Sequence, residues 1–225
     1  MSLESLPLLL GWGTLVGLDL VSVPQVMIAR PLVAGAVAGA ILGDLEMGLR
    51  VGVVFELFQF DILPVGAVRY PEYGPATVAA TSAAHAAVGA LGLGVGAVVG
   101  LLTAVLGGMS IHALRRANAR AVHAAAGPLE AGDSRALVHV HVASILRDAL
   151  RAALVTAVGL GLAAAARAVI GGTLSLRGVT LVAAAAAGAA LAVGAAGTLR
   201  LLGRGANLGW FAAGLAGGTA VAWWR

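Results

Sequence analysis

Residues 44–77 read DLEMGLRVGVVFELFQFDILPVGAVRYPEYGPAT, and this stretch changes character halfway along its length. The first half is apolar and carries Gly48, Gly52 and Glu56 at four-residue spacing, which places all three on one face of a helix. The second half holds three prolines and two glycines between residues 64 and 75, which remove backbone donors and disfavour helix. The stretch therefore predicts a helix that ends in an irregular, proline-rich segment.

The composition around this stretch is that of a membrane protein. Hydrophobic residues make up 60% of the 225 residues, charged residues make up 11%, and the mean hydropathy is +0.98. Soluble domains have about 25% charged residues, so this chain has too little polar surface to face water. The 33 glycines suit helices that pack closely in lipid. We therefore expect an all-α, polytopic integral membrane helix bundle, with about six or seven passes of roughly 20 residues each.

Two of the apolar stretches, residues 31–43 and 47–63, are too short or too interrupted for a comfortable full span. Paired short segments broken by Gly and Pro are typical of discontinuous or re-entrant helices around a transport site, and inverted repeats are one arrangement that fits them. The apolar stretches as a whole cover residues 6–28, 31–43, 47–63, 76–111, 152–172, 179–199 and 207–224.

Glycines shape the expected helix contacts. The stretch 76–111 is long enough for one tilted helix or for a tight hairpin, and the sequence leaves both open. A bend would fall near Gly92, Gly94 and Gly96. Glycines at four-residue spacing share one helix face and allow close helix contact. Such runs are Gly35–Gly39–Gly43, Gly92–Gly96–Gly100 and Gly214–Gly218.

Charge divides the chain into three regions: residues 1–111 with the candidate site, a basic connector at 112–151, and a second membrane region at 152–225. The connector holds six arginines against three acids, which predicts a cytoplasmic position. We expect Gly127–Pro128 to break it into two helices that lie on the membrane surface or dock a partner, although a solvated loop fits equally well. The start MSLESLPLLL lacks the positive charge of a cleavable signal peptide.

Carboxylates inside the apolar region are the strongest candidates for function. A charged side chain at mid-bilayer costs at least about 2.5–3.5 kcal/mol, so Glu56, Asp61 and Glu72 need a wet or hydrogen-bonded place. Ionised carboxylates accept hydroxyl hydrogen bonds, and Tyr70 and Tyr73 offer rings on which a sugar could lie. Two plainer explanations compete with this one. Glu56 could lie at an interface or form a structural pair with Arg50 or Arg69, and the tyrosines could belong to an exposed polar loop between spans.

Other polar residues point less clearly to a site. His139 and His141 are two apart and face away from each other on a helix, with no third ligand nearby, so no metal site is predicted. His85 is either a packing residue or a substrate or proton contact, and Asp19 has Arg30 as a candidate partner. The chain has no cysteine, no phosphate-binding loop and no protease motif. We therefore expect no cofactor, no nucleic acid and no catalytic activity in this chain by itself.

The quoted stretch and the residues before it resemble a known family, the IIC subunits of the mannose–fructose–sorbose sugar phosphotransferase systems. The similarity is to a co-linear pattern, which also continues more weakly through Leu146–Arg151 and Asn207–Phe211. Here that pattern comprises Arg30–Pro31–Leu32, Leu42–Gly43–Asp44, Gly48, Gly52, Glu56, Val65–Gly66–Ala67 and Pro71–Glu72.

The resemblance implies a subunit that pairs with a second membrane subunit, IID, binds a hexose and moves it across the inner (cytoplasmic) membrane by an elevator-like shift. It implies cytoplasmic IIA and IIB partners that carry the phosphoryl group on histidine, and a homo-oligomer of the IIC–IID pair in the bilayer. Glu56 and Glu72 fall on the family's carboxylate positions. The remaining candidate substrate-binding residues are Gln59, Asp61, Tyr70, Tyr73 and Gln25, the last resembling a glutamine that relatives carry at a slightly different distance from the Arg–Pro pair.

Two departures leave alternatives open. The chain ends at Arg225, about one span earlier than is typical of the family, and residues 70–75 differ from the usual small residues around the Pro–Asp motif. A diverged, solitary permease without phosphotransfer is therefore the alternative function, and a membrane scaffold is a third. We expect Glu56 and Glu72 to share a polar hollow. If both pointed into bulk water or were tied to arginines, with no polar hollow between them, the transport hypothesis itself would fail.

Overall fold

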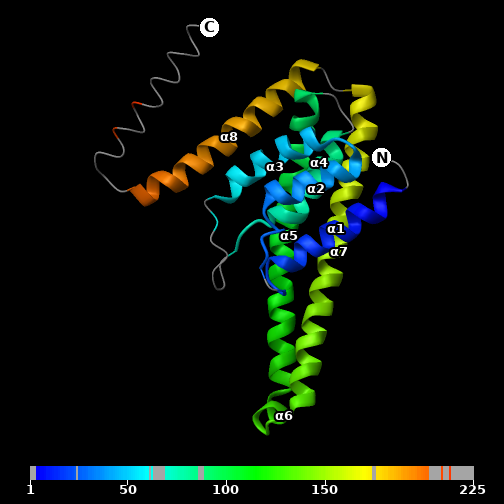
Figure 1. The fold of residues 1–225 in the computed structure, drawn as a ribbon, viewed down its shortest axis with the longest axis vertical. Helices are drawn as coiled ribbons and strands as arrows, with labels where there is room; N and C mark the ends of the chain where they lie inside the picture. Colours follow the sequence, from blue (N-terminus) through cyan, green and yellow to red (C-terminus); the bar gives the residue numbers. More distant parts are fainter. Residues whose placement is uncertain are drawn as a thin grey trace.

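A computed structural model of the chain describes residues 4–23, 25–60, 62, 69–85, 89–173, 176–202, 209 and 213. Within these ranges the regular structure is entirely helical, which confirms the all-α prediction (Figure 1). Gly214, Gly218 and Asn207–Phe211 lie wholly or mostly outside the described residues. The helices are α1 (Ser5–Asp19), α2 (Pro31–Leu42), α3 (Leu45–Gln59), α4 (Tyr73–His85), α5 (Ala90–Ala124), α6 (Ala126–Glu130), α7 (Ser134–Thr173) and α8 (Leu176–Leu202).

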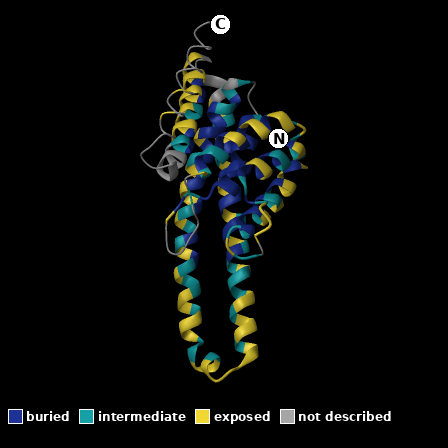
Figure 2. Ribbon diagram, turned by 60° about the vertical axis from the view of Figure 1, so that its left-hand side comes forward, coloured by how far each residue is buried: buried dark blue, intermediate teal, exposed yellow. Residues whose placement is uncertain are grey.

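Helix α4 lies at the centre of the bundle. Its sequence, YGPATVAATSAAH, is made almost entirely of small residues, and every residue from Tyr73 to Ala84 is buried (Figure 2). Small side chains let neighbouring helices approach α4 on all sides. Residues of α4 accordingly take part in three apolar clusters, which join it to α3, to α1 and α2, and to α5, α7 and α8.

Helices α2 and α3 form a short hairpin whose contact is made of glycine. A Cβ atom on Gly35 would lie 2.5 Å from the Gly48 carbonyl oxygen, and one on Gly39 would lie 2.9 Å from the Gly48 Cα. Gly43 ends α2 in the left-handed conformation with φ +73°, and Asp44 caps α3 by accepting from the Met47 N–H at 3.2 Å. At about 1.5 Å per residue these helices measure roughly 18 and 22 Å, less than the hydrocarbon core of about 30 Å.

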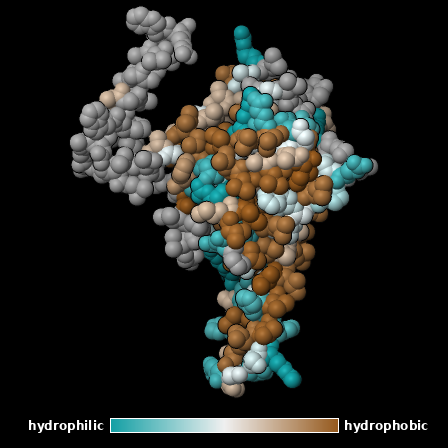
Figure 3. Space-filling view, in the orientation of Figure 1, coloured by the Kyte–Doolittle hydropathy of each residue, from teal (hydrophilic) through white to brown (hydrophobic). Residues whose placement is uncertain are grey.

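Three other helices are long and apolar enough to cross a membrane, over Leu91–Ala124, Ser134–Val169 and Arg177–Ala195. Apolar residues cover much of the visible face of the bundle, and hydrophilic residues project at the tip of the α5–α7 hairpin (Figure 3). The chain is a multi-pass membrane protein.

The stretch 76–111 is a hairpin and not one tilted helix. Helix α4 ends at His85 and α5 begins at Ala90, after Gly89 with φ +63°. The break therefore precedes Gly92–Gly96, which lie inside α5, because it is Gly89 that adopts the left-handed conformation.

The basic connector is a projecting helical hairpin. Helices α5 and α7 continue through it side by side, and α6 forms the tip (Figure 1). Gly127–Pro128 lies inside α6, and the chain turns on either side of it, at Ala125 and at Gly132 with φ +77°. The structure thus divides the connector into two long helical arms joined by the short helix α6.

One buried arginine ties the bundle together just below α4. Arg151 of α7 donates from Nη1 and Nη2 to the two carboxylate oxygens of Glu72, at 2.6 and 3.0 Å, and from Nε to Asp148 Oδ1 at 2.6 Å. It also donates to the Gly17 carbonyl of α1 at 3.3 Å. Both carboxylates have no solvent exposure, and Ser22 donates to the second oxygen of Asp148. The network thus joins α1, α7 and the segment that enters α4.

Replacing Gly48 with alanine is expected to destabilise the protein by about 1–3 kcal/mol, because the added methyl group overpacks the α2–α3 contact. Gly11→Ala is the matched control, since a Cβ at Gly11 meets nothing within 4 Å and alanine favours helix. Thermal unfolding of the purified proteins in detergent measures the difference. Equal melting temperatures for the two variants would show that the glycine contact is not tight.

Replacing Arg151 with glutamine is expected to cost about 3–5 kcal/mol, because Glu72 and Asp148 are then buried without a counter-charge. Arg147→Gln is the control: Arg147 also lies on α7 but donates to Asn118 and Ser144, with no carboxylate partner among the described residues. Thermal unfolding again provides the measurement. Equal melting temperatures for the Arg151→Gln and Arg147→Gln proteins would show that the buried network does not stabilise the fold.

Candidate functional site

A small cavity lies where three segments of the predicted site region meet. The space that water can reach inside it is about 20 Å³. The segment between α1 and α2, the end of α3 and the start of α4 each contribute to its wall. The lining residues are Leu20, Ala29, Gln59, Ile62, Tyr70, Pro71, Tyr73 and Gly74. Three of the predicted site residues, Gln59, Tyr70 and Tyr73, are therefore brought together around one space.

Asp19 shapes the wall contributed by the α1–α2 segment. Its carboxylate is 1% exposed and accepts from the backbone N–H groups of Val26 at 2.8 Å and Ala29 at 3.0 Å. Asp19 ends α1, so the irregular backbone that follows supplies these donors, and the suggested pairing with Arg30 is wrong. In the same segment Met27 adopts φ +68°, a strained conformation for a non-glycine residue.

Gln25 lies away from the cavity. Its side chain is exposed and donates to the Leu20 carbonyl at 2.9 Å. It therefore contributes to the α1–α2 turn, and the structure does not bring it together with the other predicted residues.

Glu56 joins the ends of two helices one turn before Gln59. Its carboxylate forms an ion pair with Arg30 and accepts from the Leu32 N–H at 3.2 Å, at the start of α2. A carboxylate is favourable there because the first N–H groups of a helix lack intrahelical partners. The guanidinium of Arg30 also lies 6.0 Å from the centre of the Phe60 ring. A structural pair was anticipated with Arg50 or Arg69, but Arg50 pairs with Glu46 at 2.5 Å.

Glu72 belongs to the Arg151 network described above, so the prediction that Glu56 and Glu72 share one polar hollow is not met. Each glutamate is paired with a different arginine, Arg30 or Arg151. The physical reason is that both arginines reach these carboxylates from helices distant in sequence. The hollow lies elsewhere, at Gln59 and Tyr70.

Both tyrosines are buried, so they do not form an exposed polar loop. Tyr73 stacks on Phe58, with ring centres 6.1 Å apart and an interplanar angle of 23°. The Tyr70 hydroxyl accepts from Arg115 at 3.1 Å, and the Arg115 guanidinium lies 5.6 Å from the centre of the Tyr70 ring. Asp61 lies outside the described residues.

His85 contacts the turn between α2 and α3. His85 lies 3.1 Å from an oxygen of Asp44, and this hydrogen bond is the main cause that lowers the pKa of the Asp44 carboxyl. His85 therefore packs against the α2–α3 turn, away from the cavity. In the described part of the chain no three His, Cys, Asp or Glu side chains are grouped so that they could hold a metal ion.

Sequence reasoning missed the arginines that hold the site. Arg151 stands in the run Leu146–Arg151, where its spacing of three from Asp148 is the only local signal of the pair. Nothing local links Arg151 to Glu72, or Arg30 to Glu56, because 79 and 26 residues separate the partners.

Curated relatives match part of the chain. The mannose-specific EIIC component of Escherichia coli K12 is 27% identical over 125 residues, which cover 56% of this chain and 46% of that protein. The sorbose-specific EIIC component of Klebsiella pneumoniae is 31% identical over 125 residues, with the same coverage. That of Lacticaseibacillus casei is 26% identical over 147 residues, covering 65% of this chain and 52% of the relative. The chain thus spans about half the length of the curated relatives that it matches.

Solved structures share the fold. A structure described only as a membrane protein matches with a TM-score of 0.72 and 19% identity, covering 97% of this chain and 87% of the other. The mannose transporter ManYZ in complex with microcin E492 matches with a TM-score of 0.56, 22% identity and the same coverage. The family model described as the sorbose-specific IIC component of the PTS system matches residues 5–221, nearly the whole chain. The chain belongs to this family of sorbose-type IIC components.

Proposed function

We propose that this chain is the membrane translocation subunit, the IIC component, of a phosphoenolpyruvate-dependent sugar phosphotransferase system, and that it binds a hexose in the cavity bounded by Gln59, Tyr70 and Tyr73. Membership of the family over residues 5–221 supports the transport role. The single structural observation that carries the site is the cavity itself, which opens beside the proline-broken segment at the start of α4.

The chemistry of the cavity suits a small hydroxylated ligand. The Gln59 amide offers both a donor and an acceptor, and a hydroxyl group can use either. The rings of Tyr70 and Tyr73 supply apolar area for the C–H face of a sugar. The space inside the cavity that water can reach is about 20 Å³, room for about one water molecule, so a hexose enters only when the walls move apart.

Glu56 and Glu72 enter this proposal as residues that position the cavity walls. Glu56 holds the start of α2 one turn away from Gln59, and its side chain retains 15% exposure. Glu72 follows Tyr70 and Pro71 directly and is fixed by Arg151 and by its own N–H, which donates to the Ala104 carbonyl at 2.9 Å. Loss of either anchor would therefore move residues that contact the sugar.

The proposed partners follow from the family. They are an IID membrane subunit, with which the chain would form a homo-oligomer of IIC–IID pairs in the inner (cytoplasmic) membrane, and cytoplasmic IIA and IIB proteins that bring the phosphoryl group on histidine. The chain itself carries no phosphoryl group in this scheme and catalyses no reaction alone. The similar ManYZ complex is a mannose transporter, which makes mannose a first candidate substrate here.

Removing the polar groups of the cavity is expected to weaken hexose binding. Gln59→Ala should lower affinity about ten-fold, roughly the 1–1.5 kcal/mol of a lost hydrogen bond. Glu46→Gln, at the exposed start of α3, is the control. The assay is sugar-induced thermal stabilisation of the chain purified with its IID partner, using mannose, glucose, fructose, sorbose and an N-acetylated amino sugar. No stabilisation of the unmodified protein by any of them would contradict the proposal.

The two glutamates are expected to differ when neutralised. Glu72→Gln should lower the melting temperature more than Glu56→Gln, because Glu72 is fully buried against Arg151 while the Arg30–Glu56 pair is partly exposed. Glu56→Gln should stay folded and inserted but lose sugar uptake, since Gln59 shifts with it. Thermal unfolding and uptake are measured on the same preparations. Full sugar uptake by a folded Glu56→Gln protein would show that Glu56 has no role in the site.

A further inference from the structure

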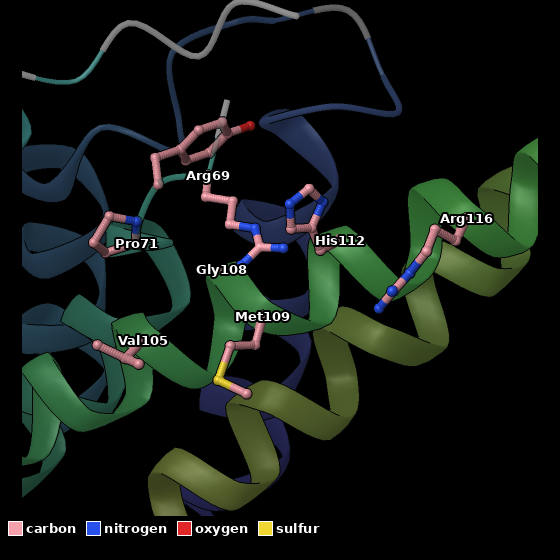
Figure 4. Close-up of a pocket in the computed structure, with 8 residues that line it drawn as sticks. Arg69, Pro71, Val105, Gly108, Met109, His112 and Arg116 are labelled. Carbon is pink, nitrogen blue, oxygen red and sulfur yellow. The ribbon is translucent and has the colours of Figure 1, made fainter. Parts of the chain in front are cut away.

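A second hollow, with a basic rim, shares Tyr70 and Pro71 with the sugar cavity. It is open, about 330 Å³ in volume, and lies between residues 69–71 and one face of α5 (Figure 4). Arg69, His112 and Arg116 line it together with the apolar side chains of Val105 and Met109.

Two glycines build this hollow. A Cβ atom on Gly107 would lie 2.6 Å from Glu72 Oε2, and one on Gly108 would collide with the Tyr70 carbonyl oxygen. The chain entering α4 can therefore cross α5 in direct backbone contact. This crossing brings Arg69 beside His112, and Arg116 extends back along α5 toward the same space (Figure 4).

Among the described residues, no carboxylate pairs with the two arginines that line the hollow, Arg69 and Arg116. The nearby carboxylates of Glu72 and Asp148 are both engaged by Arg151. The neighbouring Arg115 contacts Tyr70. Two guanidinium groups that converge in this way suit a phosphate group, because guanidinium binds phosphate oxygens bidentately.

The depth of the hollow matches the headgroup layer of a membrane. The apolar part of α5 runs from Leu91 to Ile111, roughly 31 Å at about 1.5 Å per residue, which equals the hydrocarbon thickness of about 30 Å. His112 and Arg116 follow directly. The basic connector also places this end of α5 on the cytoplasmic side, where the membrane surface is negatively charged.

An exposed apolar stripe leads from the hollow into the membrane. Val98, Leu102, Val105 and Met109 are all exposed and recur at three- and four-residue spacing, so they share one face of α5. The face is apolar along its length and becomes basic at His112 and Arg116. A phospholipid has the same order of parts, with acyl chains below a phosphate.

We propose that this hollow binds the phosphate of an anionic phospholipid of the cytoplasmic leaflet, held by Arg69 and Arg116, with an acyl chain along the α5 stripe. The site is separate from the sugar cavity and does not depend on the identity of the sugar. Because Tyr70 lines both spaces, a bound lipid would also fix one wall of the sugar cavity.

The test uses the full chain purified with its IID partner, stripped of lipid, and titrated with phosphatidylglycerol or phosphatidylcholine while bound lipid is counted by native mass spectrometry. Arg69→Gln and Arg116→Gln should each weaken phosphatidylglycerol binding about five-fold, the equivalent of about 1 kcal/mol per basic residue at a membrane surface. Arg120→Gln, one turn further along α5 and outside the hollow, removes the same charge and should leave binding unchanged.

Two further arms separate a lipid from other occupants. Met109→Gln should weaken phosphatidylglycerol binding because it interrupts the apolar stripe, and glycerol phosphate, which has no acyl chain, should not compete at millimolar concentration. Effective competition by glycerol phosphate, with no effect of Met109→Gln, would replace the lipid by a soluble phosphate ligand and overturn the proposal.

Three other results would also overturn it. An equal loss of binding in Arg120→Gln would indicate diffuse electrostatic attraction only. Equal binding of phosphatidylglycerol and phosphatidylcholine, or a complex in which IID covers this face of α5, would likewise contradict the proposal. If Arg69→Gln did not fold, Arg116→Gln would carry the test alone, because Arg116 is exposed and makes no ion pair among the described residues.

Discussion

A single buried guanidinium, that of Arg151, is the contact on which the arrangement of this protein depends. It lies between two carboxylates without solvent exposure and reaches the backbone of α1 as well. A charge in such surroundings is stable only when its partners satisfy it, and each partner comes from a different part of the chain. The irregular backbone before α4 is thereby fixed at its last residue, Glu72. The walls contributed by Tyr70 and Pro71 follow from that anchor.

Small residues complete the arrangement. Helix α4 is buried on every side because its neighbours approach it through glycine and alanine, as Gly96 and Gly159 do at Ala80 and Ala79. The α2–α3 hairpin uses the same device to pack two short helices backbone against backbone. Helix α3 ends at Gln59, beside the cavity, so the cavity forms where regular structure stops. This is how a membrane protein can place irregular backbone at depth without exposing it to lipid.

The sequence predicted those parts of the structure that rest on local pattern. Composition predicted the membrane helices, and the four-residue spacing of Gly35 and Gly39 predicted a close helix contact, which the structure confirms against Gly48. It could not predict which arginine meets which carboxylate. Glu72 and Arg151 are 79 residues apart and meet only because α4 and α7 pack together. For the same reason Asp19 was given Arg30 as a partner, whereas neighbouring backbone N–H groups satisfy it. The cavity could not be predicted either, because it forms only where three separate segments of the chain meet.

The cavity and the basic hollow share Tyr70, so substrate and membrane surface would act on the same segment. The central claim is that a hexose occupies the space between Gln59 and Tyr70. The most direct measurement is an electron cryomicroscopy structure of the chain with its IID partner and a saturating hexose that stabilises the complex. The account predicts sugar density within hydrogen-bonding distance of the Gln59 amide, with Glu72 still paired to Arg151. Density at any other place, or a sugar held directly by Glu72 with Arg151 displaced, would contradict it.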